Sequence, residues 1–370
     1  MRRSSENSWP PGLQVNFHPI NAASLTMTNA LYPALRHQKV LVTGGGGFIG
    51  AELSQRLLEL GAEVAVFGRR RYPRLKKQGI TCIQGDIRDA AAVLQAAKGK
   101  TCLFHVAAKA GIWGSRTEYM GINYQGTEHV LSACTKQKIP VLVYTSTPSV
   151  VFNKKDLRGA DEKSPYASRP LCAYAESKIK AEQAVLAATS PEMRTAAIRP
   201  HLVWGPHDTN LIPRLISRGQ ARQLAIIGTG ENFVDITYID NVVHAHLLAA
   251  QNLLTSATAS GEAFFIGQEE PVCLWDWINK LFSLLDIPPV IRKIPLSLAY
   301  AFGTGSEAIY WALQKTEEPK MTRFLALQLA QSHWFSHEKA KRVLNYSPQV
   351  QTDTGLARLV SWLKTSPPQQ

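Results

Sequence analysis

Two side chains that could move a proton stand four positions apart in a predicted helix over residues 173–188: Tyr174 and Lys178. Residues at this spacing lie on the same face of a helix. A phenol has a pKa of about 10, and a neighbouring ammonium favours its ionised form, so Lys178 is expected to lower the pKa of Tyr174. The hydroxyls of Ser146 and Thr147 follow a predicted strand and could bind a substrate oxygen as charge develops on it. These residue types predict proton transfer to or from an oxygen atom of a substrate.

A glycine-rich loop joins a β-rich run over 39–42 to a helix-like stretch over 48–60. Gly45, Gly47 and Gly50 match the spacing GxGxxG, and Gly44, Gly47 and Gly50 match the related spacing GxxGxxG. Glycines allow a tight turn and let backbone N–H groups approach a pyrophosphate at the positive end of the following helix. Because a strand precedes the loop and a helix follows it, the motif predicts a dinucleotide site. The residues expected to contact the cofactor here are Gly44, Gly47, Phe48, Ile49 and Gly50.

The second predicted strand, over 63–67, is followed by Gly68 and then by three arginines, Arg69, Arg70 and Arg71. A site that prefers NAD usually has Asp or Glu here for the ribose 2′-hydroxyl, whereas a guanidinium suits the 2′-phosphate of NADP. The sequence therefore favours NADP(H), with Arg69 and Arg70 as the expected contacts, and leaves NAD(H) as the alternative.

Asp86 and Ile87 follow the third predicted strand, over 81–84. In that place Asp86 could accept a hydrogen bond from an adenine amino group while Ile87 packs against the ring. The alternative for Asp86 is a helix N-cap, for which aspartate is a preferred residue.

Strands and helices alternate regularly from Lys39 to about residue 200. This alternation predicts an α/β fold of the Rossmann type, a doubly wound parallel sheet with helices on both faces. Beyond residue 200 the pattern loosens and predicts a smaller, mainly helical C-terminal lobe for the substrate. The expected division is a flexible N-terminal extension over 1–36, a dinucleotide-binding domain over 37–200 and a substrate lobe over 201–370, with 235–251 returning to the first domain.

The composition is that of a packed globular protein, with 45% hydrophobic and 19% charged residues among 370. Its five cysteines are scattered without a CxxC pair, which predicts reduced thiols and a cytoplasmic location. The net charge of +13 is spread along the chain without a nucleic-acid-binding motif, so no nucleic-acid partner is expected. His333 and His337 have helical spacing, but no third ligand is evident and no metal is expected.

One apolar stretch runs from Ile294 to Leu313 and includes Pro295, Gly303 and Glu307. These residues interrupt the roughly 20 apolar positions that a membrane span needs. The interpretation that we favour is a helix lining the substrate lobe, and the alternative is a surface that dips into a bilayer. Five tryptophans are each expected to be packed in the core, with a place in the lining of an apolar pocket as the alternative: Trp113, Trp204, Trp275, Trp277 and Trp311.

From about Lys39 to the C-terminus the chain resembles the extended short-chain dehydrogenase/reductases, and within them the 3β-hydroxysteroid dehydrogenase-like branch. The segments that carry the likeness are His105–Gly114, Tyr144–Phe152 and Arg199–Pro206, beside the glycine loop and the YxxxK motif. They look most similar to bacterial members that reduce 2-alkyl-3-oxoalkanoates, which are β-keto acids, with NADPH.

The resemblance implies a role for each matching residue. Tyr174 would be the acid/base, Lys178 would hold the nicotinamide ribose, and Thr147 would bind the substrate oxygen, with Ser146 as the second candidate. Asn123 stands where the family has an asparagine that organises the site. Thr147 replaces the commoner serine but keeps the hydroxyl. Further cofactor contacts implied in this way are Ala107, Ala108, Lys109, Pro200 and Leu202.

These observations predict an NADPH-dependent oxidoreductase that reduces a ketone to a secondary alcohol on a bulky apolar small molecule. Three alternatives remain open: a 3β-hydroxysteroid or sterol dehydrogenase that runs the same chemistry in reverse, a nucleotide-sugar epimerase, and a non-catalytic NAD(P)-binding regulator. The resemblance also implies a homodimer, and peripheral membrane contact or a multi-enzyme assembly.

Overall fold

A seven-stranded parallel sheet forms the centre of the computed structural model, which describes residues 31–365. Its strands follow the order β12-β7-β5-β4-β1-β2-β3, so the order reverses between β1 and β4. In an open parallel sheet such a switch point leaves a crevice at the carboxyl ends of the strands. The strands in sheet order are β12 (Glu262–Ile266), β7 (Arg194–Pro200), β5 (Val141–Thr145), β4 (Cys102–His105), β1 (Lys39–Thr43), β2 (Glu63–Gly68) and β3 (Thr81–Gln84).

The inner strands of this sheet are apolar on both faces. In β1, Val40 and Val42 belong to one core cluster and Leu41, between them, belongs to the cluster on the opposite face. Successive side chains of a strand point to opposite faces, so a run that is buried throughout needs helices on both sides. The Rossmann-type fold predicted from the sequence is confirmed.

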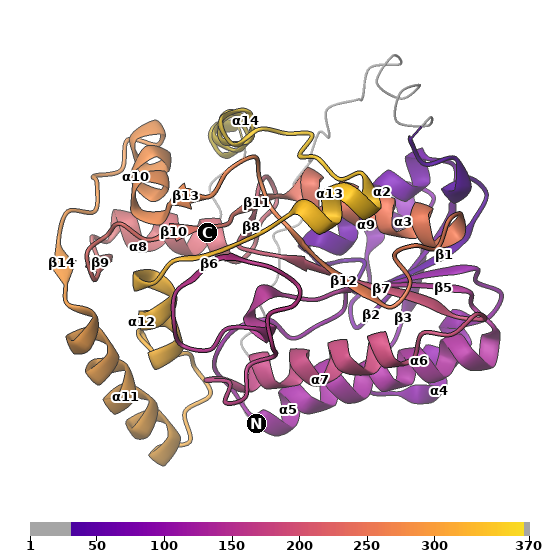
Figure 1. Ribbon diagram of the computed structural model, residues 1–370, viewed down its shortest axis with the longest axis horizontal. Helices are drawn as coiled ribbons and strands as arrows, with labels where there is room; N and C mark the ends of the chain where they lie inside the picture. Colours follow the sequence, from indigo (N-terminus) through magenta and orange to yellow (C-terminus); the bar gives the residue numbers. More distant parts are fainter. Residues whose placement is uncertain (1–30, 366–370) are drawn as a thin grey trace.

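Helices cover both faces of the sheet (Figure 1). One face carries α2 (Phe48–Glu59) and α9 (Ile239–Leu254), which pack against each other, and the other carries α4 (Ala90–Ala97), α6 (Gly126–Gln137) and α7 (Ala173–Ala187). The other short helices around the central sheet are η1 (Pro33–Leu35), α3 (Pro73–Lys77), α5 (Arg116–Tyr119), the π-helix η2 (Met120–Gln125), η3 (Pro148–Val150) and α13 (Glu338–Leu344).

The second half of the chain forms a smaller lobe but also returns to the central sheet. The edge strand β12 comes from this half and pairs with β7. Its four consecutive residues Ala263–Ile266 are apolar and buried, so this strand lies in the core. Helix α9 includes most of the segment 235–251 and packs against β5 and β7. The helices of the small lobe are α8 (Leu211–Gln220), α10 (Leu274–Leu284), α11 (Leu296–Ala312), α12 (Arg323–Ala330) and α14 (Thr352–Thr365).

The small lobe also contains short strands, of which the sequence pattern indicated only β9, in a predicted strand near 224–227. They contain two to four residues each, which is too few for an alternating pattern. Four of them form a sheet in the order β13-β10-β15-β6, and two further pairs are β11-β8 and β14-β9. Their bounds are β6 (Leu157–Ala160), β8 (Val203–Trp204), β9 (Ile226–Ile227), β10 (Phe233–Val234), β11 (Thr237–Tyr238), β13 (Val272–Cys273), β14 (Lys293–Ile294) and β15 (His333–Phe335).

Residues 1–30 of the expected N-terminal extension lie outside the described residues. Its last residues are packed: Tyr32 and Leu35 are buried, and the Tyr32 hydroxyl hydrogen-bonds the Nδ1 atom of His244 in α9. The backbone N–H of Ala34 donates to Gln251 in the same helix at 2.9 Å. The segment 31–36 is therefore part of the folded domain and not a flexible extension.

The apolar stretch 294–313 folds as helix α11 of the small lobe, but this helix lies at the surface and does not reach the central cavity. Only Ala299 and Gly303 of this helix are buried, and α12 lies between α11 and the cavity. Trp311, expected in the core, is 79% exposed, whereas Trp204, Trp275 and Trp277 are buried as predicted. The error arises because residue types alone do not determine which apolar helix the fold leaves at the surface.

Candidate active site

A cavity of about 710 Å³ opens at the carboxyl ends of β1 and β4, where the strand order reverses. It is large enough for a cofactor and part of a substrate. Most of the predicted site residues line it. They are Gly44, Gly47, Phe48, Ile49, Gly50, Arg69, Arg70, Asp86, Ile87, Ala107, Ala108, Lys109, Ser146, Thr147, Tyr174, Lys178, Pro200 and Leu202.

The glycine loop brings the chain into contact with itself at two points. Gly44 has φ +69°, and a Cβ atom there would lie 2.8 Å from the Cα atom of Ala107 in the loop after β4. A Cβ atom on Gly50 would lie 2.3 Å from the carbonyl oxygen of Gly44. No side chain caps the N-terminus of α2, and its first turn has no acidic residue. This cradle of free N–H groups at a helix N-terminus fits the pyrophosphate of a dinucleotide.

The arginines after β2 stand at the rim of the same cavity. Arg69 and Arg70 are exposed and line it beside Gly68. Asp86 lies nearby, but its carboxylate is bound by Arg88 through contacts of 2.6 and 3.0 Å, and this partner holds the Asp86 pKa down to about 2. The predicted N-cap alternative for Asp86 is wrong, because Asp89 caps α4 by accepting from two backbone N–H groups.

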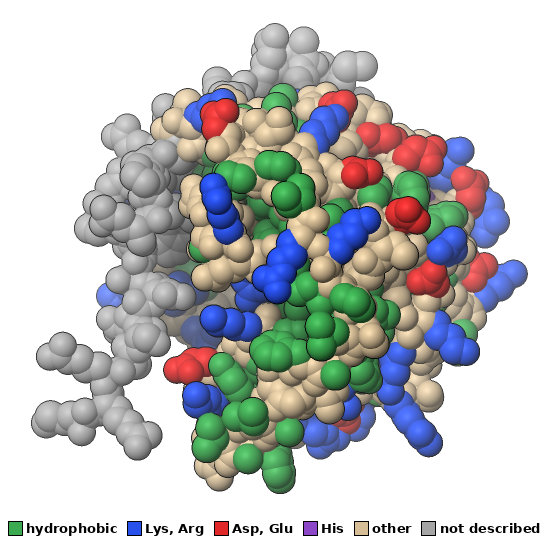
Figure 2. Space-filling model, turned by 90° about the vertical axis from the view of Figure 1, so that its left-hand side faces the viewer, with side chains coloured by type: hydrophobic (Ala, Val, Ile, Leu, Met, Phe, Trp, Pro, Cys, Tyr) green, Lys and Arg blue, Asp and Glu red, His purple; other side chains and the backbone are tan. Residues whose placement is uncertain are grey.

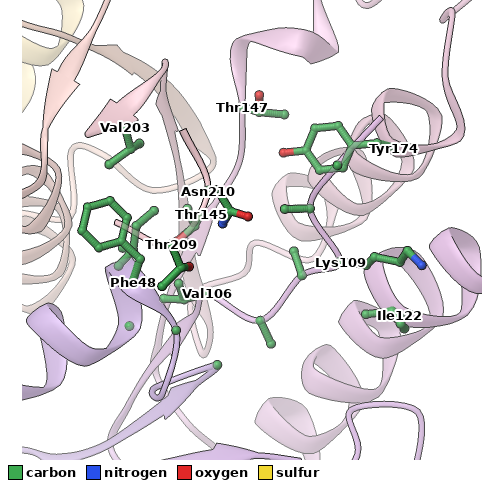
Figure 3. A pocket seen from close by; sticks show the side chains of 18 of the residues that line it. Phe48, Val106, Lys109, Ile122, Thr145, Thr147, Tyr174, Val203, Thr209 and Asn210 are labelled. Carbon is green, nitrogen blue, oxygen red and sulfur yellow. The ribbon is translucent and has the colours of Figure 1, made fainter. Parts of the chain in front are cut away.

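The phenol of Tyr174 faces Thr147 across the floor of the cavity (Figure 3). Burial raises the pKa of Tyr174 to about 12, and a hydrogen bond with the Thr147 side chain opposes that rise. Lys178 is itself buried, which lowers its pKa to about 7. Its ammonium donates to the carbonyl oxygen of Thr145 at 2.7 Å and lies 4.1 Å from the centre of the Tyr144 ring. The Tyr174 pKa therefore moves in the direction opposite to the one expected from Lys178, because burial of the phenol dominates.

Ser146 offers a second hydroxyl on the cavity floor. Its Oγ atom is buried and makes no hydrogen bond to any residue in 31–365. Its backbone N–H donates to the Ile198 carbonyl at 2.6 Å, which fixes the residue against β7. A buried polar atom without a partner is costly. The Ser146 hydroxyl is therefore suited to a ligand atom that completes its hydrogen bonding.

Asn123 does not line the cavity but holds two of its walls together. Its side chain accepts from the Lys109 N–H at 2.7 Å and donates to the Lys109 carbonyl at 3.1 Å. The same amide nitrogen donates to the hydroxyl of Ser177 in α7 at 3.0 Å. Asn123 thus ties the loop after β4 to the helix that carries Tyr174, and the π-helical turn places it there.

The family comparison matches this architecture. Residues 41–296 match the model of the 3-beta hydroxysteroid dehydrogenase/isomerase family. This chain belongs to that family. It is an NAD(P)-dependent oxidoreductase of the extended short-chain dehydrogenase/reductase fold.

The sequences of relatives in this dehydrogenase family align with most of the chain. A 2-alkyl-3-oxoalkanoate reductase of Shewanella oneidensis is 42% identical and covers 92% of this chain and 89% of its own. The reductase of the same name from Stenotrophomonas maltophilia is 44% identical, with 87% of this chain and 98% of its own covered. A sterol-4-alpha-carboxylate 3-dehydrogenase (decarboxylating) of Mus musculus is 33% identical, with 91% and 94% covered.

Solved structures share the family fold. The crystal structure of gox2253 has a TM-score of 0.72 at 25% identity and covers 88% of this chain and 98% of its own. MoeE5 in complex with UDP-glucose and NAD has a TM-score of 0.68 at 24% identity, with the same coverage. At this identity the likeness of MoeE5 concerns the fold alone.

Four residues that were not among the predicted site residues form an apolar wall of the cavity: Ile112, Val203, Leu211 and, from α12, Phe324. Ile112 and Val203 lie in segments that carry the family resemblance, whereas no sequence motif indicated Leu211 or Phe324. Figure 3 shows Val203 and Phe48 across the cavity from Tyr174. Leu202, a predicted cofactor contact beside Val203, has a φ of +39°, which is rare outside glycine and marks a constrained turn at the cavity.

A hydrogen-bonded chain connects this wall to the small lobe. The Nε2 atom of His201 lies 2.7 Å from Nδ1 of His333, and the Nε2 atom of His333 lies 2.8 Å from the Gln328 carbonyl. Burial lowers the pKa of both histidines, so both are neutral at pH 7. Among residues 31–365 no group of three or more potential metal ligands occurs, and no helix is long and apolar enough to cross a membrane.

Proposed function

We propose that this protein reduces the 3-oxo group of a 2-alkyl-3-oxoalkanoate to a 3-hydroxy group with NADPH. The observation that carries the proposal is the arrangement of hydroxyls on the cavity floor. Tyr174 and Thr147 face each other, and the buried Ser146 hydroxyl has no partner among the described residues. The names of the two bacterial relatives at 42–44% identity support the choice of substrate.

The side chains suit a reduction. When bound, NADPH would supply the hydride that reduces the ketone carbon. The phenol of Tyr174, with its pKa raised to about 12, holds its proton at neutral pH and would donate it to the ketone oxygen. The hydroxyls of Thr147 and Ser146 would donate hydrogen bonds to that oxygen as negative charge develops. One hydride and one proton convert the ketone to a secondary alcohol, so the reaction balances.

Lys178 has a positioning role in this proposal. Its ammonium is fixed between the Thr145 carbonyl and the Tyr144 ring, one helical turn from Tyr174. There it would hold the ribose of the cofactor and favour the ionised phenol that remains after proton donation. Figure 3 shows Lys109 pointing away from Tyr174 and Thr147, and its ammonium pairs with Glu118 at 2.5 Å, so it is not a proton donor to the substrate.

The apolar wall of the cavity fits the alkyl chains of the substrate. Ile112, Val203, Leu211 and Phe324 converge on the cavity from four separate segments. Burying apolar side groups of a ligand against such a wall stabilises binding by roughly 25 cal/mol for each Å² of apolar surface removed from water.

The preference for NADPH is proposed from Arg69 and Arg70. Replacing both with serine is expected to raise the KM for NADPH by about 10- to 100-fold, because two guanidinium groups no longer meet the 2′-phosphate. The KM for NADH should stay within about twofold, since NADH lacks that phosphate. Initial rates with each cofactor measure this directly. Arg71→Ser is the matched control, because Arg71 does not line the cavity and hydrogen-bonds Gln84 instead. Equal losses with both cofactors would contradict the assignment.

The substrate is tested by supplying both candidate classes to the purified protein. NADPH oxidation should be observed with a 2-alkyl-3-oxo fatty acid, and NADP⁺ reduction should be slower by about 10-fold or more with a 4α-carboxy 3β-hydroxysterol. The sterol is included because the 33% identical relative is named for that activity. Turnover of the sterol alone would replace the proposed substrate but retain the site. Turnover of neither substrate would contradict the proposed function.

A further inference from the structure

Helix α11 (Leu296–Ala312) has an apolar face that points away from the protein. Leu298, Phe302 and Ile309 share this face and are 61%, 60% and 58% exposed. Trp311, two positions after Ile309, lies on another side of the helix and is 79% exposed. The other exposed positions of the helix are Ser297, Thr304 and small residues, with no charged side chain. Scattered apolar residues are normal on a surface, whereas a contiguous group on one helix indicates a binding surface.

The opposite face of α11 is firmly attached to the protein. A Cβ atom on Gly303 would lie 2.7 Å from the backbone of Thr322, so the helix touches the start of α12 closely. Glu307 pairs with Arg323 at 2.7 Å across the same contact. Leu296 and Tyr300 pack against a cluster of which Phe324 is a member. The outward face is therefore held in a fixed orientation.

Basic residues stand at both ends of this face. Arg292 and Lys293 precede the helix, and Lys315 and Lys320 follow it, all of them exposed. Two carboxylates lie in the same stretch: Glu317 is exposed, and Glu318 is paired with Arg214 at 2.6 Å, so positive charge remains in excess. Figure 2 shows hydrophobic side chains gathered in the lower half of this view, at the level of α11, with Lys and Arg around them, while most acidic side chains lie in the upper half.

We propose that the outward face of α11 is a peripheral membrane-binding surface for a bilayer that contains anionic lipids. The helix has 17 residues and is about 25 Å long, and it would lie in the plane of the interface with its apolar side chains among the acyl chains. Trp311 suits the headgroup boundary, where tryptophan is enriched. The basic residues at the two ends would contact lipid phosphates and add electrostatic attraction to the apolar contact.

Charge favours a bilayer over a second copy of this chain. In a two-fold symmetric contact through α11 the same patch would meet itself, and the basic residues of the two copies would face one another or lie close together. Like charges brought together oppose association, whereas anionic headgroups neutralise them.

The surface is also close to the proposed site. Trp113 donates a hydrogen bond to the Lys315 carbonyl at 3.1 Å, and its ring contacts Tyr310 near the end of α11. Trp113 directly follows Ile112, which lines the cavity. A substrate with long alkyl chains that is dissolved in a bilayer would thus leave the membrane beside the cavity.

The test is flotation of the full-length protein with vesicles of phosphatidylglycerol and phosphatidylethanolamine in roughly equal amounts, at low and high salt. We expect binding at about 50 mM NaCl that falls at least about fivefold at about 500 mM NaCl, and about tenfold weaker binding to phosphatidylcholine vesicles. The variant Leu298→Ser/Phe302→Ser/Ile309→Ser should lose about tenfold or more in vesicle partitioning. Phe233→Ser is the matched control, because Phe233 is an exposed aromatic residue on β10, outside α11.

Thermal unfolding of each variant verifies that the fold is kept. We expect the triple variant to fold normally, because all three substituted side chains are exposed. Absence of wild-type binding to the anionic vesicles would overturn the proposal, and so would unchanged binding of the triple variant. Sedimentation velocity gives the remaining outcome: an oligomer that the triple substitution dissociates, without vesicle binding, would overturn it in favour of a protein interface. None of these measurements depends on enzymatic activity, so a wrong substrate would not affect them.

Discussion

Tyr174→Phe is expected to lower kcat for ketone reduction by about 10²- to 10⁴-fold, the range that a single general acid contributes. The substitution removes one oxygen atom from a side chain whose phenol faces Thr147 on the cavity floor. Phenylalanine keeps the ring and its packing, so the loss should fall on kcat while NADPH binding stays within about twofold. An interaction made only in the transition state has this kinetic signature.

Single-turnover measurement of NADPH oxidation with saturating keto acid isolates the chemical step, and NADPH fluorescence gives the dissociation constant. Tyr119→Phe is the matched control. The ring of Tyr119 lies 6.3 Å from that of Tyr174, but its hydroxyl donates to the carbonyls of Ala110 and Trp113 and does not reach the cavity. The control should therefore retain kcat within about threefold. Wild-type kcat in Tyr174→Phe would show that another group donates the proton.

Local patterns are sufficient to predict the nucleotide-binding half of the molecule. The run 39–42, the glycine loop and the helix after it are adjacent in sequence, and each has a clear period or a steric requirement. The carboxyl ends of parallel strands meet at one edge, so the motifs after β1, β2, β4 and β5 can be placed together from their order along the chain. That is why so many of the predicted residues line one cavity.

The features that sequence patterns did not indicate depend on contacts between distant parts of the chain. Phe324 and Ile112 meet at the cavity although more than 200 residues separate them. The exposure of α11 depends on α12 lying beneath it, and its sequence alone resembles a buried helix. The pKa of Tyr174 follows from burial, and spacing along a helix carries no information on burial. Each of these requires the tertiary structure.

The helix that carries Tyr174 and Lys178 is fixed by a third residue on the same face, Glu182. Its carboxylate accepts two hydrogen bonds from Arg199 of β7, at 2.9 and 2.5 Å. The exposed fractions of the two side chains are 3% for Arg199 and 0% for Glu182, so water cannot replace either partner. Arg199 directly precedes Pro200, which lines the cavity. The ion pair thus couples the position of α7 to the strand beside the site.

Arg199→Met is expected to lower the free energy of unfolding by about 3–5 kcal/mol, because it leaves the Glu182 carboxylate buried without its partner. Chemical denaturation monitored by circular dichroism measures this loss. Arg358→Met is the matched control: its pair with Asp240 at 3.2 Å is half-exposed, and such pairs contribute at most about 1 kcal/mol. The double variant Arg199→Met/Glu182→Leu should recover at least half of the loss, since it removes the uncompensated charge.

The same double variant separates stability from positioning. If the ion pair serves only stability, restoring the unfolding free energy should restore kcat as well. If it also positions α7, kcat should remain reduced by about 10-fold while NADPH binding recovers, because small displacements of reacting groups slow the chemical step. We expect the second result, since the bidentate geometry of the pair fixes both the register and the rotation of α7 relative to β7. Apolar packing between the two substituted side chains has no comparable directionality. It would leave α7 and β7 free to shift relative to each other.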